Sequence, residues 1–405
     1  MDTELNRRVE SAMPGIALLA LNSGSSSLKY GLFLAEQSEV RQAYHGAVEG
    51  IGTGQGRQWM RSAEGQEVSD HGHAISDQAD AIEAVAGKLR ELSLPALAGV
   101  GHRVVHGGPA LQEHQRITQD VLKQLEAATH FAPLHVPIAL KVIRAAQRCF
   151  PGVPEFACFD TAFHHTLPEV AARLPLPERF WRAGVRRYGF HGLSCESVVH
   201  ALGAKVGKRT IVAHLGSGAS ITAIANGVSV DTTMGLTPTG GVVMGTRCGD
   251  LDPGVLLHIL RTSGSGVDEL ERLLDKECGL LGISGLSSDM RRLHEAGDNP
   301  LARLAIDMFS RSAKKAIASF MGILEGLDLL VFTGGIGEHD AVVREKICCG
   351  LEPLGILLDA SRNGRNLETI SASESPARVQ IVPTEEEAQI ARHTYRLLQD
   401  GGLLA

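Results

Sequence analysis

The feature that most constrains the fold is a short polar turn that joins two apolar runs. Residues 16–21 (IALLAL) lead into Asn22–Lys29 (NSGSSSLK), and a second apolar run, YGLFL, follows at 30–34. This pattern predicts a strand, a tight turn and another strand. Glycine lets backbone N–H groups approach a ligand closely, and lysine supplies a compact positive charge, so the turn suits the oxygens of a phosphate.

The same design recurs at residues 212–224 (VAHLGSGASITAI), and a third glycine-rich turn follows an apolar run at 330–338 (LVFTGGIGE). One such turn is a weak signal. Three of them, each at the end of an apolar strand, favour a nucleotide held between two halves. Because the first two turns lie about half a chain apart, we predict an internal duplication of one β-rich α/β unit. Strand-like runs that alternate with helical ones are typical of the α/β class.

Composition narrows the class of protein. The 405 residues suggest two or three domains, and a net charge of −7 without a basic block argues against nucleic acid as a partner. No apolar run approaches the ~18–20 residues that cross a membrane. The seven cysteines form no CxxC or zinc-binding pattern, which favours the reducing cytoplasm.

Two local patterns predict helices. Apolar residues at spacings of three and four indicate a helix over Ser76–Leu92. A second helix is expected near the C-terminus after a short strand at 379–382, with Thr384 and Glu387 as a capping box. That assignment leaves Glu386 to face a site, although a glutamate in a first turn also stabilises a helix without any catalytic role.

Two segments imitate nucleotide-binding loops. GAKVGKR at 203–209 has one residue too few between its glycines for a Walker loop, and it has arginine where serine or threonine would bind magnesium. GSG at 216–218 is followed by a strand-like run rather than by a helix, and Ile221 occupies the place of the third glycine of a dinucleotide fingerprint. Neither a Walker fold nor a Rossmann site is predicted.

Four further segments carry residues suited to phosphoryl transfer. Arg103, among glycines and valines, could pair with a carboxylate or phosphate, and Asp160 ends an apolar strand as magnesium-holding aspartates do. His191 lies among cations and aromatics, and Arg247 lies in the glycine-rich stretch 231–254, which is predicted to be an ordered loop. Each also has a purely structural interpretation. Arg103 could be a surface arginine, Asp160 could cap a turn and His191 could be a core histidine. The stretch that holds Arg247 could be a long connection. Two arginines and one metal without a nucleophile fit a reaction that depends on positioning and charge neutralisation.

Taken together, these segments resemble the acetate kinase family. The family's motifs occur in its own order over about residues 16–398, as NSGSSSLKYGLF, GHRVVHGG, APLH, FDTAFHHTLP, RRYGFHG, HLGSGAS, DTTMGLTPTGG, MGTRCGDLDPG, FTGGIGE and PTEEE. The resemblance implies duplicated ribonuclease H-like (actin-like ATPase) domains with a nucleotide cleft between them. The expected domains are 15–160 with the C-terminal helix 384–405, and 161–383, preceded by an extension at 1–14.

The resemblance also implies residue roles. Asp160, His191 and Arg247 match catalytic positions, Arg103 matches the substrate-binding arginine, and the magnesium positions are Asn22 and Glu386. The pocket for the acetate methyl group is matched by Val105, Leu134, Phe190 and Pro238. The nucleotide-binding positions are matched by Lys29, His214, Leu215, Gly216, Ser217, Gly218, Asp289, Met290, Arg291, Gly335, Ile336, Gly337, Glu338 and His339.

The implied activity is reversible, magnesium-dependent transfer of a phosphoryl group from ATP to acetate, with Mn²⁺ as an alternative metal, in a cytoplasmic homodimer. A propionate or butyrate kinase on the same fold and a non-catalytic ATP-binding scaffold are the alternatives. The chain departs from the family's usual residues at Val136, Leu193, Cys195, Ser217 and His339. These departures leave acyl-chain preference and nucleotide affinity open.

Overall fold

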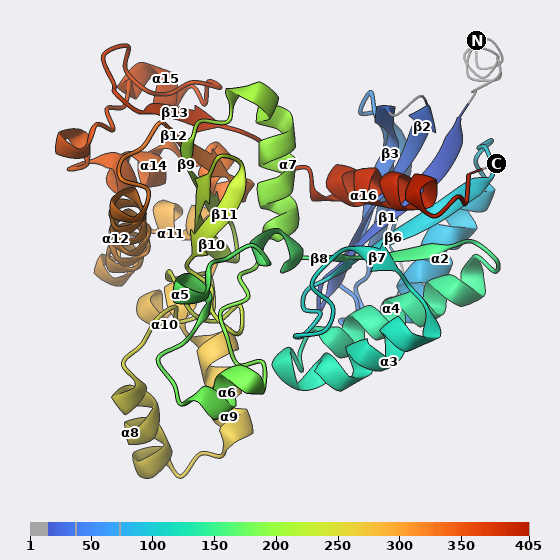
Figure 1. The fold of residues 1–405 in the computed structure, drawn as a ribbon, viewed down its shortest axis with the longest axis horizontal. Helices are drawn as coiled ribbons and strands as arrows, with labels where there is room; N and C mark the ends of the chain where they lie inside the picture. The colour runs from blue at the N-terminus through green and yellow to red at the C-terminus, as the bar shows by residue number, and fades with distance from the viewer. Residues whose placement is uncertain (1–14, 37–38, 73, 405) are drawn as a thin grey trace. The chain divides into compact units, whose positions relative to one another are not determined.

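The computed structural model describes residues 15–36, 39–72 and 74–404, so the expected extension at 1–14 lies outside the described residues. The chain forms two compact units (Figure 1). The first contains residues up to Ala162 together with Glu385–Ala405, and the second is Phe163–Thr384. The C-terminal segment therefore completes the unit that the N-terminal half begins.

The first unit is built on a mixed sheet of eight strands, in the order β5-β4-β3-β2-β1-β6-β8-β7. Its strands are β1 (Ile16–Ser23), β2 (Ser27–Glu36), β3 (Glu39–Glu49), β4 (Arg57–Ser62), β5 (Glu67–Gly72), β6 (Leu97–Val104), β7 (Gln115–Arg116) and β8 (Glu155–Phe159). Strands β1, β2 and β3 are antiparallel neighbours, whereas β6 runs parallel to both β1 and β8. The predicted strand–turn–strand at 16–34 is the β1–β2 pair, in which Asn22 lies opposite Lys29.

Helices cover both faces of this sheet. They are α2 (Gln78–Arg90), α3 (Gln119–Ala127), α4 (Val136–Cys149) and α16 (Glu386–Asp400). Apolar side chains of α2 and α4 form one core with Val100 of β6. The neighbouring residues Gly99 and Gly101 approach α16 instead, and because side chains alternate along a strand, α16 covers the opposite face.

The contact of α16 with β6 depends on glycine. A Cβ added to Gly101 would lie 2.3 Å from Thr394 Oγ1 and 2.5 Å from Ile390 Cγ2. We expect Gly101→Ala to lower the free energy of unfolding by about 1–3 kcal/mol, as overpacking does, in urea denaturation. Gly87→Ala in α2 is the matched control, because a Cβ there meets nothing within 4 Å and should add up to about 1 kcal/mol of stability. Equal effects of the two substitutions would contradict tight packing at Gly101.

The second unit repeats the strand arrangement of the first. Its sheet has the order β11-β10-β9-β12-β13, formed by β9 (Arg209–Leu215), β10 (Ala219–Ala225), β11 (Val228–Thr232), β12 (Leu329–Thr333) and β13 (Arg378–Ile381). Three antiparallel strands are followed by two parallel ones, just as in β3-β2-β1-β6-β8. This shared order confirms the predicted α/β class and the internal duplication.

Two helices pack on the sheet of the second unit, α7 (Gly192–Leu202) and α12 (Pro300–Ile323). Figure 1 shows them on opposite sides of it, and α7 buries Cys195, Val198 and Leu202 against β9, β10 and β12. The other helices are α5 (Glu169–Ala172), α6 (Glu178–Arg182), α8 (Pro253–Ser263), α9 (Val267–Arg272), α10 (Gly279–Ser284), α11 (Met290–Glu295), α13 (Gly334–His339), α14 (Ala341–Cys348) and α15 (Ala360–Gly364). Within the described ranges, no helix has the length and apolar character needed to cross a membrane.

Most predicted elements are present, but one detail is wrong. The helix predicted over Ser76–Leu92 is α2, capped by Asp77, and the strand predicted at 379–382 is β13. The third glycine-rich turn is a strand–helix junction, because α13 begins directly after β12. The predicted capping box of the last helix is absent: α16 has no side-chain cap, since the Thr384 hydroxyl bonds to Ser194 and the Glu387 carboxylate accepts from Asn22.

Candidate active site

A charged cluster forms at one edge of the first unit's sheet. Asn22 lies near the end of β1, Arg103 near the end of β6, and Asp160 directly after β8. Because β1, β6 and β8 are mutually parallel, their carboxyl ends meet at the same edge. Helix α16 begins at this edge with Glu386 and thereby adds a fourth side chain.

Arg103 is the centre of this cluster. Its Nε donates to Asp160 Oδ1 at 3.1 Å and to Oδ2 at 2.9 Å, and its Nη2 also donates to Oδ2. Its Nη1 donates to Asn22 Oδ1 at 3.2 Å. The Asp160 side chain is only 1% exposed, so the ion pair is largely removed from water. Arg103 therefore holds the buried Asp160 carboxylate in place in the absence of substrate.

Two further carboxylates reach Asn22 from the start of α16. Asn22 Nδ2 donates to Glu386 Oε2 at 3.0 Å and to Glu387 Oε1 at 2.8 Å. Burial alone would lower the pKa of Arg103, but the charges of Asp160, Glu386 and Glu387 outweigh it and hold that pKa above its ordinary value. Glu387 belongs to this cluster although its spacing from Thr384 predicts a capping box instead.

The donor set fits a hard divalent cation. Asp160, Glu386 and Glu387 bring three carboxylates to the Arg103 guanidinium. The amide oxygen of Asn22 and carboxylate oxygens are the ligands that Mg²⁺ prefers. Lys29 is exposed on β2, and since directly opposed residues share a face of an antiparallel pair, it lies on the same face as Asn22.

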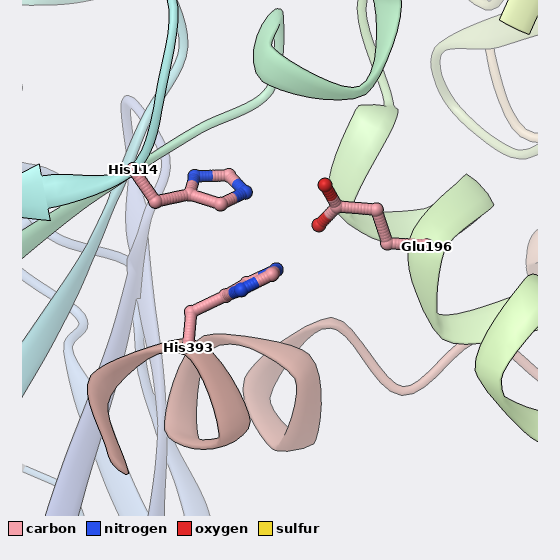
Figure 2. Close-up of side chains that lie close together, drawn as sticks. All are labelled: His114, Glu196 and His393. Atoms are coloured by element: carbon pink, nitrogen blue, oxygen red, sulfur yellow. The ribbon is translucent and has the colours of Figure 1, made fainter. Parts of the chain in front are cut away.

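A histidine pair braces the elements that carry the cluster. His114 Nδ1 accepts a hydrogen bond from the Phe159 backbone N–H at 3.0 Å, one residue before Asp160. Its ring lies against that of His393 of α16, with the ring centroids 3.9 Å apart (Figure 2). The end of β8 and the second turn of α16 are thus linked through side chains, which helps to fix Asp160 and Glu386.

The second unit brings a different pair of predicted residues together. His191 precedes α7 with a left-handed backbone (φ 58°, ψ 27°), a conformation that costs energy for any residue except glycine. A Cβ added to Gly218 would lie 3.1 Å from His191 Nε2 and 3.6 Å from Arg247 Nη1. The glycine turn after β9 therefore faces an imidazole and a guanidinium, as a site for phosphate oxygens requires.

The strained backbone at His191 is stabilised by a hydrogen bond from His164 to the carbonyl oxygen of the preceding residue, Phe190. Burial lowers the pKa of His164 to about 4, so its ring is neutral near pH 7. Its Nε2 lies 3.0 Å from the Phe190 carbonyl oxygen and donates to it, while its Nδ1 lies 2.9 Å from Ser229 Oγ. Gly189 is required here, because a Cβ would lie 2.6 Å from the His164 ring.

Arg247 lies in the ordered loop that the sequence predicts, between β11 and α8. Its Nη1 donates to the Pro238 carbonyl oxygen at 2.8 Å and lies 3.6 Å from Met244 Sδ. The loop is packed closely, since a Cβ on Gly279 would lie 2.2 Å from the Met244 carbonyl oxygen. The loop is also tied to the glycine turn, because Gly245 N–H donates to the Ser217 carbonyl oxygen at 3.0 Å.

The remaining predicted nucleotide positions form two short segments of the second unit. Asp289 caps α11 and pairs with the exposed Arg291, and Met290 is buried. In α13, Glu338 Oε1 accepts from the backbone N–H of both Gly334 and Thr384. Arg344, which is fully buried, donates to the Gly337 carbonyl oxygen at 2.9 Å and so anchors that helix.

The residues predicted for the methyl pocket belong to both units. Val105 is buried and Leu134 is 39% exposed in the first unit, and Phe190 and Pro238 are buried in the second. The departures from the family pattern fall into two groups. Three of them, Val136, Leu193 and Cys195, are fully buried in the core. The other two, Ser217 and His339, are exposed.

Three hydroxyl residues near His191 and His214 are not predicted as site residues by the sequence. Ser194 Oγ lies 2.8 Å from His214 Nδ1, Ser220 Oγ lies 3.0 Å from His191 Nδ1, and Thr384 bonds to Ser194. The rings of His191 and His214 are stacked, with centroids 4.2 Å apart and planes 21° apart. No local spacing indicates these bonds, since Ser194 and His214 lie 20 positions apart and His191 and Ser220 lie 29 positions apart.

Known proteins of similar sequence and structure identify the family of this chain. A sequence profile described as the acetokinase family matches residues 17–392. An acetate kinase of Nitrobacter hamburgensis is 42% identical over 95% of this chain and 96% of its own length. A propionate kinase of Citrobacter rodentium is 40% identical over 94% of this chain and 96% of its own.

A solved structure extends the agreement to three dimensions. The crystal structure of Porphyromonas gingivalis acetate kinase matches with a TM-score of 0.84 and 37% identity, covering 95% of this chain and 100% of that one. Sequence, profile and structure therefore agree over nearly the whole length. The chain belongs to the acetokinase family.

Proposed function

We propose that this protein is an acetate kinase, which transfers the γ-phosphoryl group of ATP directly to acetate and gives acetyl phosphate and ADP. The observation that carries the proposal is the charged cluster of Asn22, Arg103, Asp160 and Glu386 at the strand ends of the first unit. The acetate kinases among the relatives support it. The transfer is reversible, since an acyl phosphate and ATP are both high-energy phosphoryl donors.

The residues divide the work as follows. Arg103 binds the carboxylate of acetate by two parallel N–H bonds, and the methyl group contacts Val105, Leu134, Phe190 and Pro238. Asp160 orients Arg103 at the reacting carboxylate. His191 and Arg247 donate hydrogen bonds to the oxygens of the transferring phosphoryl group, whose charge is spread over three oxygens.

ATP contacts three segments of the second unit. These are the turn His214–Gly218, the segment Asp289–Arg291 and the helix residues Gly335–His339, with Lys29 as an additional cation. Mg²⁺, or Mn²⁺ in its place, is held by Asn22 and Glu386, and Glu387 shares the same amide. The metal supplies charge neutralisation to the phosphates.

The test is an assay that traps the acyl phosphate with hydroxylamine in the presence of ATP and Mg²⁺. Acetate, propionate and butyrate are compared by kcat/KM. We expect acetate to give the highest value. A preference for propionate would favour the second candidate, a propionate kinase, which the Citrobacter rodentium relative supports. If the protein binds ATP but no acyl hydroxamate is trapped with any of the three acids, the result would favour a non-catalytic scaffold and contradict the proposal.

A metal-dependence experiment separates Glu386 from a capping role. Glu386→Gln keeps the shape of the side chain but removes one negative charge from the metal site. We expect the Mg²⁺ concentration for half-maximal activity to rise by roughly 10–100-fold, as for weakened metal sites, with activity partly restored by excess Mg²⁺.

Glu385→Gln is the matched control, because Glu385 precedes Glu386 and its 61% exposed side chain pairs with Arg392. It should leave the Mg²⁺ requirement unchanged. If Glu386→Gln needs the same Mg²⁺ concentration as the unsubstituted protein, Glu386 does not hold the metal and its role is purely structural.

The quaternary state and compartment are part of the proposal. None of the residues of α8, all of which the structure describes, is buried, and Val255 and Leu257 are 40% and 51% exposed. An apolar helix left open in this way supports a homodimer, in which α8 packs on the second copy. The molecular mass in solution, measured by light scattering, tests it. The seven cysteines form no disulfide among the described residues, which supports a cytoplasmic location.

A further inference from the structure

Three side chains of the second unit form a hydrogen-bonded chain that ends on an imidazole. Thr384 Oγ1 donates to Ser194 Oγ at 2.9 Å, and Ser194 Oγ lies 2.8 Å from His214 Nδ1. Ser194 is completely buried and His214 is 8% exposed, so water does not complete these bonds. The partners lie on α7, on β9 and in the segment after β13, all within the second unit.

The direction of each bond follows from counting protons. The Ser194 hydroxyl has a single proton, and the Thr384 proton already occupies one of its lone pairs. Within the described part of the chain, His214 Nδ1 is the acceptor that the Ser194 proton can reach. Leaving a buried hydroxyl proton without an acceptor would cost about 1–3 kcal/mol. Ser194 therefore donates to Nδ1, and Nδ1 must be the unprotonated nitrogen.

We propose that Thr384 and Ser194 are positioning residues that hold His214 in the tautomer protonated at Nε2. The Nε2 atom faces the glycine turn, since a Cβ added to Gly216 would lie 3.8 Å from it. An Nε2–H group donates a hydrogen bond to a phosphate oxygen, whereas an Nε2 lone pair would repel it. The ligand, a nucleotide phosphate, rests on the proposed function, but the tautomer does not.

The neighbouring histidine is held differently. Among the described residues, the Ser220 hydroxyl bonds to His191 Nδ1 and receives no proton from a second hydroxyl. It can donate to Nδ1 or accept from it, so the Ser220 contact is compatible with either protonation state of His191. Because the two rings are stacked at 4.2 Å, two imidazolium charges there would repel each other. Keeping His214 neutral removes that repulsion when His191 carries a proton.

The tautomer can be read directly by NMR. In histidine-labelled protein without nucleotide or acetate, long-range ¹H–¹⁵N correlations distinguish Nδ1–H from Nε2–H rings, and His214→Gln assigns the signals. We expect a pure Nε2–H pattern for His214. Thr384→Val keeps the shape but removes the donated proton, so an Nδ1–H form should appear. Thr384→Ser keeps the hydroxyl and should restore the original pattern.

The control is Thr222→Val, which removes a hydroxyl from the buried Thr222–Thr232 pair of the same sheet. It should leave the His214 signals unchanged. In kinetics, Thr384→Val should raise the KM for ATP by about 2–5-fold with little change in kcat, because only the fraction in the correct tautomer binds. An Nδ1–H ring or an imidazolium at His214 in the unsubstituted protein at neutral pH, or Thr384→Val spectra identical to those of Thr384→Ser, would overturn the proposal. Since the spectra need no substrate, they remain decisive even if no acyl phosphate is formed.

Discussion

Replacing Arg103 by alanine should both raise the KM for acetate strongly and lower the free energy of unfolding by about 3–5 kcal/mol. The kinetic effect is expected because the guanidinium is the proposed partner of the substrate carboxylate. The stability effect is expected because Arg103 pairs with Asp160, which is 1% exposed, and its loss leaves an uncompensated buried charge. Steady-state kinetics with acetate varied and urea denaturation measure the two effects separately.

A double substitution distinguishes these two contributions. Asp160→Asn removes the buried charge, so Arg103→Ala combined with it should recover much of the lost stability and none of the activity. Arg57→Ala is the surface control: the Arg57 side chain of the pair with Asp70 is 52% exposed, and such pairs contribute at most about 1 kcal/mol. If Arg103→Ala unfolds at the same urea concentration as the unsubstituted protein, the buried pair does not stabilise the fold.

Arg247→Ala should lower kcat by about 10³-fold or more while changing the KM for ATP and acetate little. Its guanidinium is held by the Pro238 carbonyl oxygen beside Gly218, where it can meet charge that develops on the transferring phosphoryl group. Arg247→Lys should restore little, because an ammonium group is a point charge and lacks the planar fork of N–H donors.

The matched control for Arg247 is Arg272→Ala, because Arg272 is 65% exposed and pairs with Glu277 on the surface of the same unit. Its kcat should equal that of the unsubstituted protein. The measurement is initial velocity at saturating substrates for all three variants. A kcat for Arg247→Ala within tenfold of the unsubstituted value would remove Arg247 from the transition state.

The duplicated fold could be predicted because its signals are local. Each glycine turn lies directly after an apolar strand, so the β1–β2 and β9–β10 pairs can be recognised within 20 residues of sequence. The sheet orders could not be predicted in this way. Strands β12 and β13 pair in parallel although about 45 residues separate them, and no local pattern encodes that register.

In the candidate site, too, local features can be predicted from the sequence and long-range contacts cannot. Glycine and cationic residues can be recognised from local sequence, but the approach of Glu386 to Asn22 spans 364 positions and is expected only from the family resemblance. The capping box failed for a related reason. The Thr384 hydroxyl had two competing partners, the start of its own helix and Ser194, which is 190 positions away. Only the folded chain decides between a local bond and a distant one.

The return of α16 to the first unit has a consequence for biosynthesis. The sheet face under α16, with Gly99 and Gly101, is translated early, but its cover emerges only after the roughly 220 residues of the second unit. At about 5–20 residues per second, that delay is on the order of 10–40 s on the ribosome. The second unit is continuous in sequence and can close as soon as it has emerged. The first unit is therefore synthesised first but completes its folding last. Until α16 covers it, its apolar sheet face is the surface to which a chaperone would bind.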